Sequence, residues 1–527
     1  MTTVSEAFYD VLRRHGVRAV FGNPGSNELP FLRDLPVDLP YYLALQEGAA
    51  VAMADGYAQA SESVGFVNLH AASGTANGMG CLTNTASSHT PLVITAGQQA
   101  RRYVPVNALL TNVDAIRLCD PLVKWAGEPL RPQDGPLLAA KACHLAQSAP
   151  AGPVYLSVPL DDWSHPADEA ALGQLLNRSV HGDPVVGGAS VSALVEALRQ
   201  AVNPVLVLGA GVDTQTGFAA AVDLAERARL PVWIAPSPSR APFPTRHRCF
   251  RGRLPSAAGA LAQALAGHDL ILSFGAPVFR YHEPSDGGLL PSGAELYGVT
   301  DDPDEASRAP FGHLVVGDPE DAIARVAAAA HTTARPWPQR SRRAVADSSG
   351  EGFTAEAILD AINNGKSDDA VISLEWTSAG TIGDRIDITR EKSLYFPAAG
   401  ALGWGLPAAI GIQLAQPDRP VLALIGDGAM HYTVSALWTA ARYQVPVTFV
   451  IANNAQYAAL AGFSQMLDVP QASYLDIPGL DVVKIADGYG VAAHRIEDLA
   501  ELTHVVKAGM AATGPRLVEV PQQKTTN

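Results

Sequence analysis

The chain has 527 residues, of which 47% are hydrophobic and 17% are charged. This length exceeds what one hydrophobic core supports, and the composition excludes a disordered chain. The net charge of −15 and the lack of a Lys/Arg run exclude nucleic acid as an expected partner.

Three features predict where the protein resides. The four cysteines, Cys81, Cys119, Cys143 and Cys249, have no metal-ligand spacing, so buried thiols in a reducing compartment are expected. The first ten residues contain Glu6 and Asp10 and no apolar signal core. The uncharged stretch from Ser63 to Ala100 is too rich in Gly, Ser, Thr and Asn to cross a membrane, and is expected inside the protein or at a subunit interface. We expect a soluble, cytoplasmic protein without a membrane partner.

The first predicted block alternates short apolar strands with helical patterns. Its expected strands are Ala19–Phe21, Tyr41–Leu45, Val64–Leu69, Leu92–Ala96 and Val154–Val158. A helix of small residues is expected from Gly48 to Ala60. The mostly polar stretch from His165 to Gly188 is a candidate linker.

The second predicted block opens with the strand Pro204–Leu208, and Leu270–Phe274 and Leu296–Val299 are further strands. The first strand is followed by Gly209-Ala210-Gly211, but Thr214 stands where a dinucleotide motif would have its third glycine. A structural turn is therefore favoured over a flavin or nicotinamide site. The Pro/Arg/Ser-rich stretch from Thr332 to Gly350 is a predicted linker.

The third predicted block contains the most specific motif. The strand Val421–Ile425 ends in Gly426-Asp427-Gly428, and the strand Val445–Ile451 ends in Asn453-Asn454. The 24 residues between Gly428 and Asn453 suit one crossover helix between parallel strands. A carboxylate and a carboxamide at neighbouring strand ends offer the oxygen ligands that Mg²⁺ prefers. A third strand, Ala370–Leu374, is expected in the same sheet.

Three polar residues stand out in the first block. Glu47 begins the predicted helix of small residues, where a catalytic carboxylate and an ordinary helix-start Glu are equally favoured. His70 ends a predicted strand, which is where parallel sheets bind ligands. Ser26 lies in a turn-rich loop, and His282 in the second block has no local feature that sets it apart.

With these residues assembled, the whole chain resembles the thiamine-diphosphate-dependent 2-oxo acid decarboxylases. The stretches that carry the resemblance are 21–32, 43–60, 109–115, 275–282, 398–411 and 425–457. The resemblance implies an α/β fold of three parallel-sheet domains: 1–182 for the aminopyrimidine, 183–341 as a central domain, and 342–527 for the diphosphate and Mg²⁺. It further implies a homotetramer, built as a dimer of dimers, with active sites at the dimer interface.

The resemblance also implies individual roles. Asp427, Asn454 and the Gln456 carbonyl would bind Mg²⁺, for which Ca²⁺ could substitute. The other expected cofactor-binding residues are Glu47, Thr377, Ser378, Gly400, Leu402, Gly428 and Tyr457. The expected catalytic residues are Glu47, Ser26, His70 and His282. The expected substrate pocket is Leu110, Phe396, Ala459, Leu460 and Phe463.

The implied reaction is non-oxidative decarboxylation of an aromatic 2-oxo acid, benzoylformate first, through a ylide and an enamine of thiamine diphosphate. Three alternatives stay open. The first is another reaction of the same cofactor, with phenylpyruvate or a branched-chain 2-oxo acid as substrate or with carboligation to 2-hydroxyketones. The second is a synthase-like member with FAD in the middle block, which Thr214 opposes, and the third is an inactive paralogue. Ala429 and Trp376 depart from the family pattern near the cofactor and leave the substrate range open.

Overall fold

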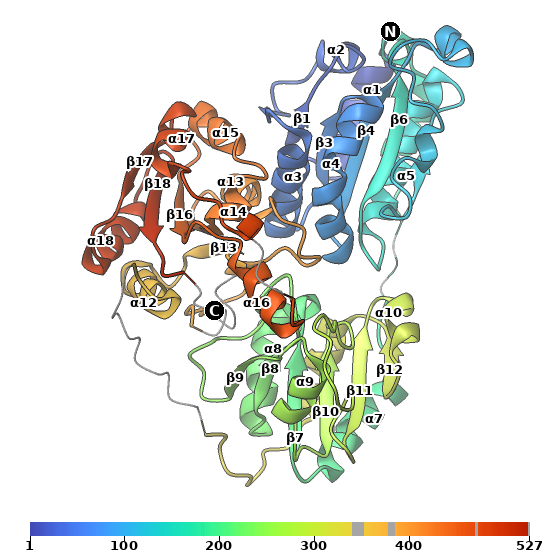
Figure 1. Ribbon diagram of the computed structural model, residues 1–527. Helices are drawn as coiled ribbons and strands as arrows, with labels where there is room; N and C mark the ends of the chain where they lie inside the picture. Colours follow the sequence, from blue (N-terminus) through green and yellow to red (C-terminus); the bar gives the residue numbers. More distant parts are fainter. Residues whose placement is uncertain (181, 183, 340–351, 378–384, 470–472, 525–527) are drawn as a thin grey trace.

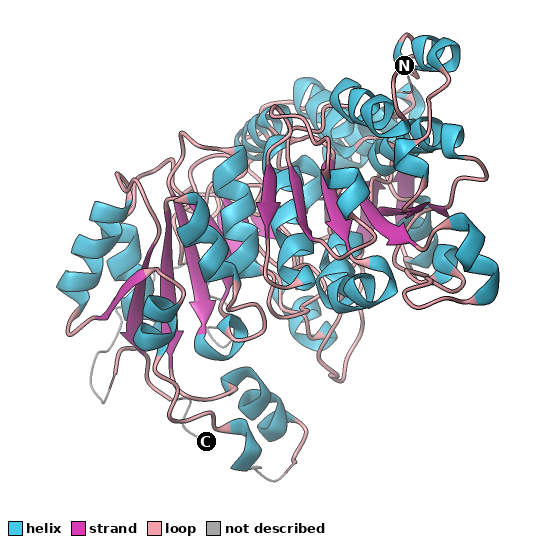
Figure 2. Ribbon diagram, turned by 90° about the horizontal axis from the view of Figure 1, so that it is seen from above, coloured by secondary structure: helices cyan, strands magenta, loops and turns pink. Residues whose placement is uncertain are grey.

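The computed structural model describes residues 1–180, 182, 184–339, 352–377, 385–469 and 473–524 (Figure 1). These residues form three six-stranded sheets in which every strand pair is parallel, with helices packed on both faces (Figure 2). This confirms the predicted α/β fold with three parallel sheets. The predicted domain borders, at 182/183 and 341/342, fall beside or outside the described residues and stay predictions.

The strands of each sheet come from one continuous part of the chain. The first sheet, ordered β2-β1-β3-β4-β6-β5, comprises β1 (Val20–Asn23), β2 (Tyr41–Leu43), β3 (Gly65–Leu69), β4 (Leu92–Gln98), β5 (Ala126–Gly127) and β6 (Val154–Pro159). The second, ordered β12-β11-β10-β7-β8-β9, comprises β7 (Pro204–Leu208), β8 (Val232–Ile234), β9 (Phe250–Arg253), β10 (Leu270–Phe274), β11 (Glu295–Thr300) and β12 (His313–Val316). The third, ordered β14-β13-β15-β16-β18-β17, comprises β13 (Val371–Glu375), β14 (Leu394–Tyr395), β15 (Val421–Gly426), β16 (Val447–Asn453), β17 (Ala492–Arg495) and β18 (Arg516–Pro521).

The helices that cover these sheets are mostly short. Those around the first sheet are α1 (Val4–Arg14), α2 (Leu29–Leu32), α3 (Glu47–Ser61), α4 (Ala71–Ser87), α5 (Gly135–Gln147) and α6 (Glu169–Leu176). Those around the second are α7 (Gly188–Gln200), α8 (Gln215–Arg227), α9 (Ala258–Ala264), α10 (Pro303–Arg308) and α11 (Pro319–Ala329). Those around the third are α12 (Ala355–Gly365), α13 (Gly405–Ala415), α14 (Asp427–Met430), α15 (Ala436–Tyr443), α16 (Ala458–Met466), α17 (Val482–Gly488) and α18 (Leu499–Gly509). Among the described helices, none is both long enough and apolar enough to traverse a bilayer.

Each sheet has a point where the strand order reverses. These points lie between β1 and β3, between β7 and β10, and between β13 and β15. Crevices for ligands form at such points, beyond the carboxyl ends of the strands. In the second sheet the crevice is closed, because a Cβ at Gly209 or Gly211 would collide with Gly275 or Ala276. Thr214 caps α8 by accepting from Gly217 N at 3.0 Å, so the Gly-Ala-Gly sequence is the predicted structural turn.

Helices α3 and α13 join the first and third sheets and lie side by side in Figure 1. A Cβ at Gly56 would overlap the Ala408 carbonyl, and a Cβ at Gly411 would overlap the Met53 carbonyl. Trp404, just before α13, donates to Asp55 Oδ2 at 2.7 Å, and Gln416, just after α13, donates to the Ala60 carbonyl at 3.0 Å, so the two helices contact each other from the start of α13 to its end. The small residues of α3 therefore serve a helix–helix contact that large side chains would block.

Other expectations are refined by the structure. All four cysteines are buried free thiols, as predicted. The strand predicted over Tyr41–Leu45 ends at Leu43. The predicted linker from His165 to Gly188 contains helix α6, whose partly buried leucines, Leu172, Leu175 and Leu176, pack on the first domain. Within the uncharged stretch, β3 and β4 are buried, but α4 leaves Ser73, Ala76, Asn77 and Gly80 exposed.

Candidate active site

The first group of predicted site residues gathers where β1 and β3 end. His70 is the N-cap of α4, and its ring lies directly on Gly25, where a Cβ would overlap it. Ser26 is the next residue and is exposed. Leu110 joins this group because its carbonyl accepts from Asn27 Nδ2 at 3.4 Å. The strand ends thus bring Ser26, His70 and Leu110 to one side of the first sheet.

Glu28 holds this group together, and sequence reasoning missed it. The side chain is 1% exposed, and Oε2 accepts from His70 Nδ1 at 2.8 Å and from Gly25 N at 2.9 Å. Oε1 accepts from Gly97 N at 2.8 Å and Ala71 N at 3.1 Å. An ionised carboxylate only accepts, so Nδ1 carries the hydrogen in this pair. The one available sequence signal was an acidic residue in a turn-rich loop after a strand.

Glu47 begins α3 and is 8% exposed. Its Oε2 accepts from Asn77 Nδ2 at 3.1 Å, and a Cβ at Gly74 would stand 3.0 Å from its Oε1. Gly74 and Asn77 lie on the first half of α4, the helix that begins at His70. The structure therefore brings Glu47 and His70 together around the N-terminal half of α4.

The second group gathers at the ends of β13, β15 and β16. Gly426 pairs with Ala452, so Asp427 and the Asn453-Asn454 pair leave the sheet at the same level. Asp427 Oδ2 accepts from Ala455 N at 3.0 Å, and Asn454 Oδ1 accepts from Gln456 N at 3.1 Å. Helix α15 lies between the two strands, which confirms the predicted crossover.

The oxygens of this group fit a hard cation. Asp427 is 4% exposed, and burial raises its pKa to about 6 although backbone N–H groups oppose the shift. Asn454 is 5% exposed, and the Oε1 atom of Gln456 is buried without a hydrogen-bond donor. In the described part of the chain, no Lys, Arg or His forms an ion pair with Asp427. A buried carboxylate with neighbouring amide oxygens and no protein cation is the donor set that Mg²⁺ uses beside phosphates.

Other predicted cofactor residues surround Asp427. Tyr457 covers Gly428, because a Cβ at that glycine would stand 2.8 Å from the tyrosine ring. Thr377 is exposed just after β13, across the strand-order reversal from Asp427. Ser378, the neighbouring predicted residue, lies outside the described residues. Trp376, noted in the sequence as a departure from the family that the chain resembles, is buried and donates from Nε1 to Gln522 Oε1 at 3.0 Å.

Gly400 and Leu402 lie in a loop before α13 that the buried side chains of Glu375 and Asn84 hold. Gly400 has φ +72° and is exposed, whereas Leu402 is partly buried against the core shared by α3 and α13. Glu375 accepts from Gly403 N and Gly405 N, each at 2.7 Å, and burial raises its pKa to about 7. Asn84 of α4 bonds the backbone of Ala399 and Ala401. Sequence reasoning missed both Glu375 and Asn84.

The predicted substrate residues lie beside this second group. The rings of His282 and Phe463 meet edge to face with centroids 5.1 Å apart. Phe463, Ala459 and Leu460 share α16, which starts just after Tyr457, and Leu460 is 52% exposed. Phe396 precedes the Gly400 loop and receives the Arg253 guanidinium over its ring at 5.6 Å. The structure thus joins His282 to the second group and leaves His70 with the first.

Within one chain the two groups lie apart. Helix α4 contacts both groups, because its Asn77 donates to Glu47 and its Asn84 donates to the carbonyl of Ala401, the residue before Leu402. These two contacts are seven residues apart on α4, so they are separated by on the order of 10 Å along the helix. A single chain holds two half-sites: a first half-site with Ser26, Glu28, Glu47 and His70, and a second half-site with Gly400, Leu402, Asp427, Asn454 and His282.

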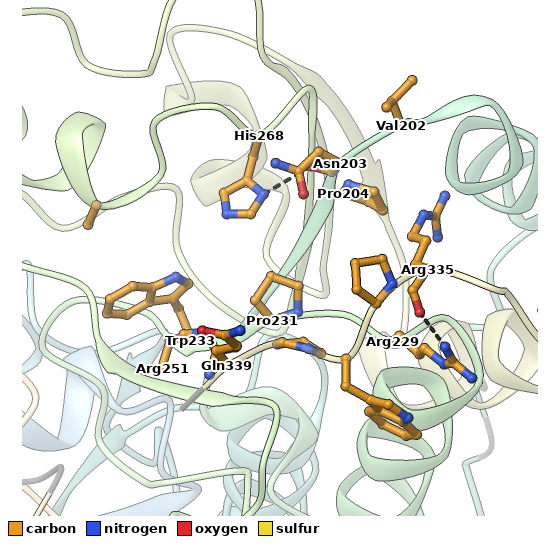
Figure 3. Close-up of a pocket in the computed structure, with 14 residues that line it drawn as sticks. Val202, Asn203, Pro204, Arg229, Pro231, Trp233, Arg251, His268, Arg335 and Gln339 are labelled. Atoms are coloured by element: carbon orange, nitrogen blue, oxygen red, sulfur yellow. Dashed lines mark hydrogen bonds between the residues drawn. The ribbon is translucent and has the colours of Figure 1, made fainter. Parts of the chain in front are cut away.

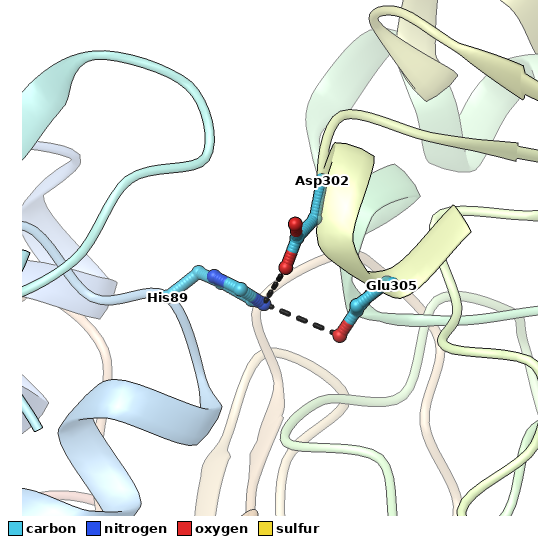
Figure 4. A group of neighbouring side chains, drawn as sticks. All are labelled: His89, Asp302 and Glu305. Carbon is cyan, nitrogen blue, oxygen red and sulfur yellow. Dashed lines mark hydrogen bonds and ion pairs between the residues drawn. The ribbon is translucent and has the colours of Figure 1, made fainter. Parts of the chain in front are cut away.

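Two other features lie outside these half-sites. His89 Nε2 stands 3.3 Å from Glu305 Oε1 and 3.7 Å from Asp302 Oδ2, the residue types of a metal site (Figure 4). The Arg280 guanidinium lies 3.5 Å from the same Glu305 oxygen, so the protein already supplies a cation there. This cluster is an ion-pair contact between the first and central domains.

A cavity of about 490 Å³ lies at the amino ends of β7, β8 and β10 (Figure 3). Its arginines hold the chain after α11: Arg229 bonds the Arg335 carbonyl, and Arg335 Nη2 donates to Ala201 O at 2.6 Å. The cavity is on the opposite edge of the central sheet from the strand ends that carry site residues, and it belongs to the packing of residues 331–339.

The fold and the two half-sites define a thiamine-diphosphate enzyme, and comparison with known families agrees. Models of thiamine pyrophosphate enzymes match the N-terminal TPP binding domain over residues 2–118, the central domain over 191–326 and the C-terminal TPP binding domain over 380–520. The chain belongs to this family.

Its relatives place it more narrowly. The chain is 51% identical over 526 residues to benzoylformate decarboxylase of Pseudomonas aeruginosa, with 99% of each chain covered. It is similar to the solved 4-hydroxybenzoylformate decarboxylase of Rhodococcus jostii, with TM-score 0.97, 47% identity and full coverage of both chains. It is also similar to benzoylformate decarboxylase of Polynucleobacter necessarius, with TM-score 0.96, 36% identity and full coverage. The chain therefore belongs to the thiamine-diphosphate-dependent 2-oxo acid decarboxylases, which confirms the resemblance inferred from its sequence.

Proposed function

We propose that the protein is a thiamine-diphosphate-dependent carboxy-lyase that converts benzoylformate, or a ring-substituted benzoylformate, to the aromatic aldehyde and CO₂. The observation that carries this proposal is that the chain contains the second half-site and is similar, over its full length, to decarboxylases of benzoylformate and 4-hydroxybenzoylformate. A role in a mandelate pathway and a cytoplasmic location are parts of the proposal.

The proposed cofactor site uses the second half-site. Asp427, Asn454 and the Gln456 carbonyl would hold Mg²⁺, or Ca²⁺ in its place, and the metal would bind the diphosphate together with Thr377, Ser378, Gly428 and Tyr457. Leu402 would support the cofactor, and the Gly400 carbonyl would accept a hydrogen bond from its aminopyrimidine. When bound, thiamine diphosphate supplies the electron sink for the bond to the departing carboxylate.

The polar residues of the first half-site would bind the substrate and move protons. Glu47, held by Asn77, would share a proton with the pyrimidine ring. Ser26 would hydrogen-bond the substrate carboxylate. His70 has Nδ1 committed to Glu28, so its Nε2 would donate a proton to the reacting carbon, and His282 would transfer the later proton at the product oxygen.

The substrate side chain would contact Leu110, Phe396, Ala459, Leu460 and Phe463. Two aromatic rings in an apolar lining suit a flat phenyl group better than a methyl group. Phenylpyruvate, a branched-chain 2-oxo acid and carboligation to 2-hydroxyketones remain the alternative proposals. A steady-state panel separates them: the proposal expects benzoylformate or its 4-hydroxy form to give the highest kcat/KM and the aldehyde as sole product. A higher kcat/KM with phenylpyruvate, or a 2-hydroxyketone as main product, would replace it.

We further propose that the first half-site of one subunit meets the second half-site of another, in a dimer that pairs into a homotetramer. The separation of Glu47 from Leu402 within one chain supports this arrangement, because α4 contacts Glu47 and the Leu402 loop at different points along its length. Exposed apolar side chains of the first domain also support it; they are Tyr103, Val106, Leu109, Leu110, Val113 and Ile116. Such exposure is typical of a surface that another subunit covers.

A mixed dimer tests this arrangement. Glu47→Gln and Asp427→Ala chains, each expected to be inactive alone, are co-expressed in equal amounts. A hybrid dimer would contain one site with neither substitution, so random pairing should restore about a quarter of wild-type activity. No restored activity in hybrids that form normally would contradict the two-subunit site.

A further inference from the structure

The loop before α13 has a composition that cannot fix its shape. Residues 398–403 read Ala-Ala-Gly-Ala-Leu-Gly, and Gly400 and Gly403 have φ values of +72° and +93°. Small side chains offer little area for packing, and left-handed glycines add conformational freedom. Yet this loop presents the Gly400 carbonyl and the Leu402 side chain, whose positions the proposed cofactor site depends on. Its shape must therefore come from groups outside it.

Asn84, on the C-terminal half of α4, supplies the most direct of these contacts. Its Nδ2 donates to Ala401 O at 2.8 Å, and its Oδ1 accepts from Ala399 N at 3.1 Å and Ala401 N at 3.3 Å. The side chain is 1% exposed, and its donor and acceptor bracket Gly400 from both sides. Only a carboxamide offers donor and acceptor at this spacing; Asp lacks the donor and Ala lacks both.

Neighbouring groups reinforce the same contact. Cys81, one turn before Asn84 on α4, points its thiol at Gly403 O at 3.8 Å. Arg280 of the central domain donates to Ser87 O at 2.8 Å and Ala398 O at 3.4 Å, which ties the end of α4 to the start of the loop. The loop is therefore docked on α4 of its own chain.

We infer that Asn84 is a positioning residue for the cofactor held by the second half-site of its own chain, although it lies in the first domain. The inference rests on the two-subunit site proposed above. Helix α4 then serves two active sites of a dimer. His70, at its start, acts in one site, and Asn84, near its end, orients the cofactor in the other.

This assignment predicts a result that differs from the one expected from the position of Asn84 in the first domain. Asn84→Ala should behave as a defect of the second half-site. Co-expressed with Glu47→Gln chains, it should be complemented, because one site per hybrid then carries neither substitution. Co-expressed with Asp427→Ala chains, it should not be complemented, because the second half-sites of both chains are altered. The reverse pattern would overturn the assignment. Failure of the Glu47→Gln and Asp427→Ala pair would instead refute the two-subunit site.

A second measurement separates positioning from folding. The exchange of the thiazolium C2 proton for deuterium, followed by quenched-flow NMR on the holoenzyme without substrate, reports cofactor orientation. Asn84→Ala should slow this exchange about 10- to 100-fold, since small misplacements of reacting groups carry costs of this size. The cofactor dissociation constant should change less than about threefold, because the diphosphate contacts around Asp427 are untouched.

Two control variants complete the experiment. Asn363→Ala removes a similar bridge, in which the side chain donates to Arg385 O at 2.6 Å and accepts from Asp387 N at 3.0 Å away from the half-sites. Thr83→Ala changes α4 next to Asn84 and removes only a bond to Gly80 O. Both should keep the wild-type exchange rate. A normal exchange rate in Asn84→Ala, or an equal loss in Asn363→Ala, would overturn the inference.

Discussion

Replacing Glu28 by Gln tests how the protein orients His70. In the native structure Glu28 Oε2 accepts from His70 Nδ1 and Gly25 N, and Oε1 accepts from Ala71 N and Gly97 N. A glutamine of the same shape must turn an NH₂ group toward one of these pairs. If the NH₂ group replaces Oε2, it faces His70 Nδ1–H and Gly25 N–H, which are both donors, and the His70 ring must change tautomer to keep a hydrogen bond. If it replaces Oε1, the N–H groups of Ala71 and Gly97 lose their acceptor.

The structure gives the size of the expected effect. A hydrogen bond to a charged partner contributes about 1.5–3 kcal/mol, and Glu28 is 1% exposed, so water does not replace it. If that energy is needed to hold His70 for proton transfer, kcat/KM with benzoylformate should fall about 10- to 100-fold, at 1.36 kcal/mol per factor of ten. Thiamine diphosphate affinity should stay close to the wild-type value, because Glu28 lies in the first half-site.

The assay combines steady-state kinetics with thermal unfolding of the holoenzyme. Glu169→Gln is the matched control, since that side chain is exposed and, within the described part of the chain, bonds only Thr2. The expected result is a loss of kcat in Glu28→Gln that exceeds its loss of thermal stability. An unchanged kcat/KM would refute the reasoning, as would a loss of activity that simply follows unfolding.

Three further predictions follow from other contacts. Gly411→Ala should lower the free energy of unfolding by about 1–3 kcal/mol or prevent folding, because its Cβ would overlap the Met53 carbonyl. The control Gly462→Ala, which faces open space on α16, should leave the melting temperature unchanged or raise it slightly. Dialysis against a chelator should abolish activity and cofactor binding, and Mg²⁺ or Ca²⁺ with thiamine diphosphate should restore both, whereas Asp427→Ala should remain inactive and bind little cofactor by calorimetry. Burial raises the pKa of Glu375 to about 7, so its protonated form stabilises the fold below about pH 4.5 and that stabilisation is lost as the pH rises through 7. The melting temperature of wild type relative to Glu375→Gln should therefore fall between pH 5 and pH 8, and a constant difference would contradict it.

The sequence predicted strands best where both faces of the sheet are covered. Apolar runs such as Pro204–Leu208, Leu270–Phe274 and Val421–Ile425 form β7, β10 and β15. Every residue of these three strands is buried except the last residue of β15. The edge strands β12 and β17 were not predicted: both have only four residues, all partly or fully exposed, and β17 contains His494 and Arg495. Helix α6 was missed because its three leucines are only partly buried and its other residues, mostly alanine and glycine, are exposed.

From the sequence, residues of the candidate site could be predicted only where they belong to a motif with a fixed spacing. Asp427 and Asn454 belong to one motif with a fixed spacing, and strand pairing brings them level. Glu28 and Asn84 act on residues 42 and more than 300 positions away, so no local pattern marks them. The resemblance supplied Glu47, His70 and His282, and the structure then divided them between two half-sites.

The loop that holds Gly400 and Leu402 is where the expectation from composition differs most from the structure. From its composition it would be flexible, because glycine and alanine dominate it. In the structure its polar backbone is bonded by Asn84 and Glu375, which are buried, and Thr433 donates to Gly403 O at 2.7 Å. Burying such groups is costly unless each finds its partner, so conformations of the loop that break these bonds are disfavoured. Rigidity in this loop therefore arises from hydrogen bonds rather than side-chain packing. In the proposed cofactor site, the aminopyrimidine would then approach bare backbone at Gly400 while Leu402 keeps a fixed position.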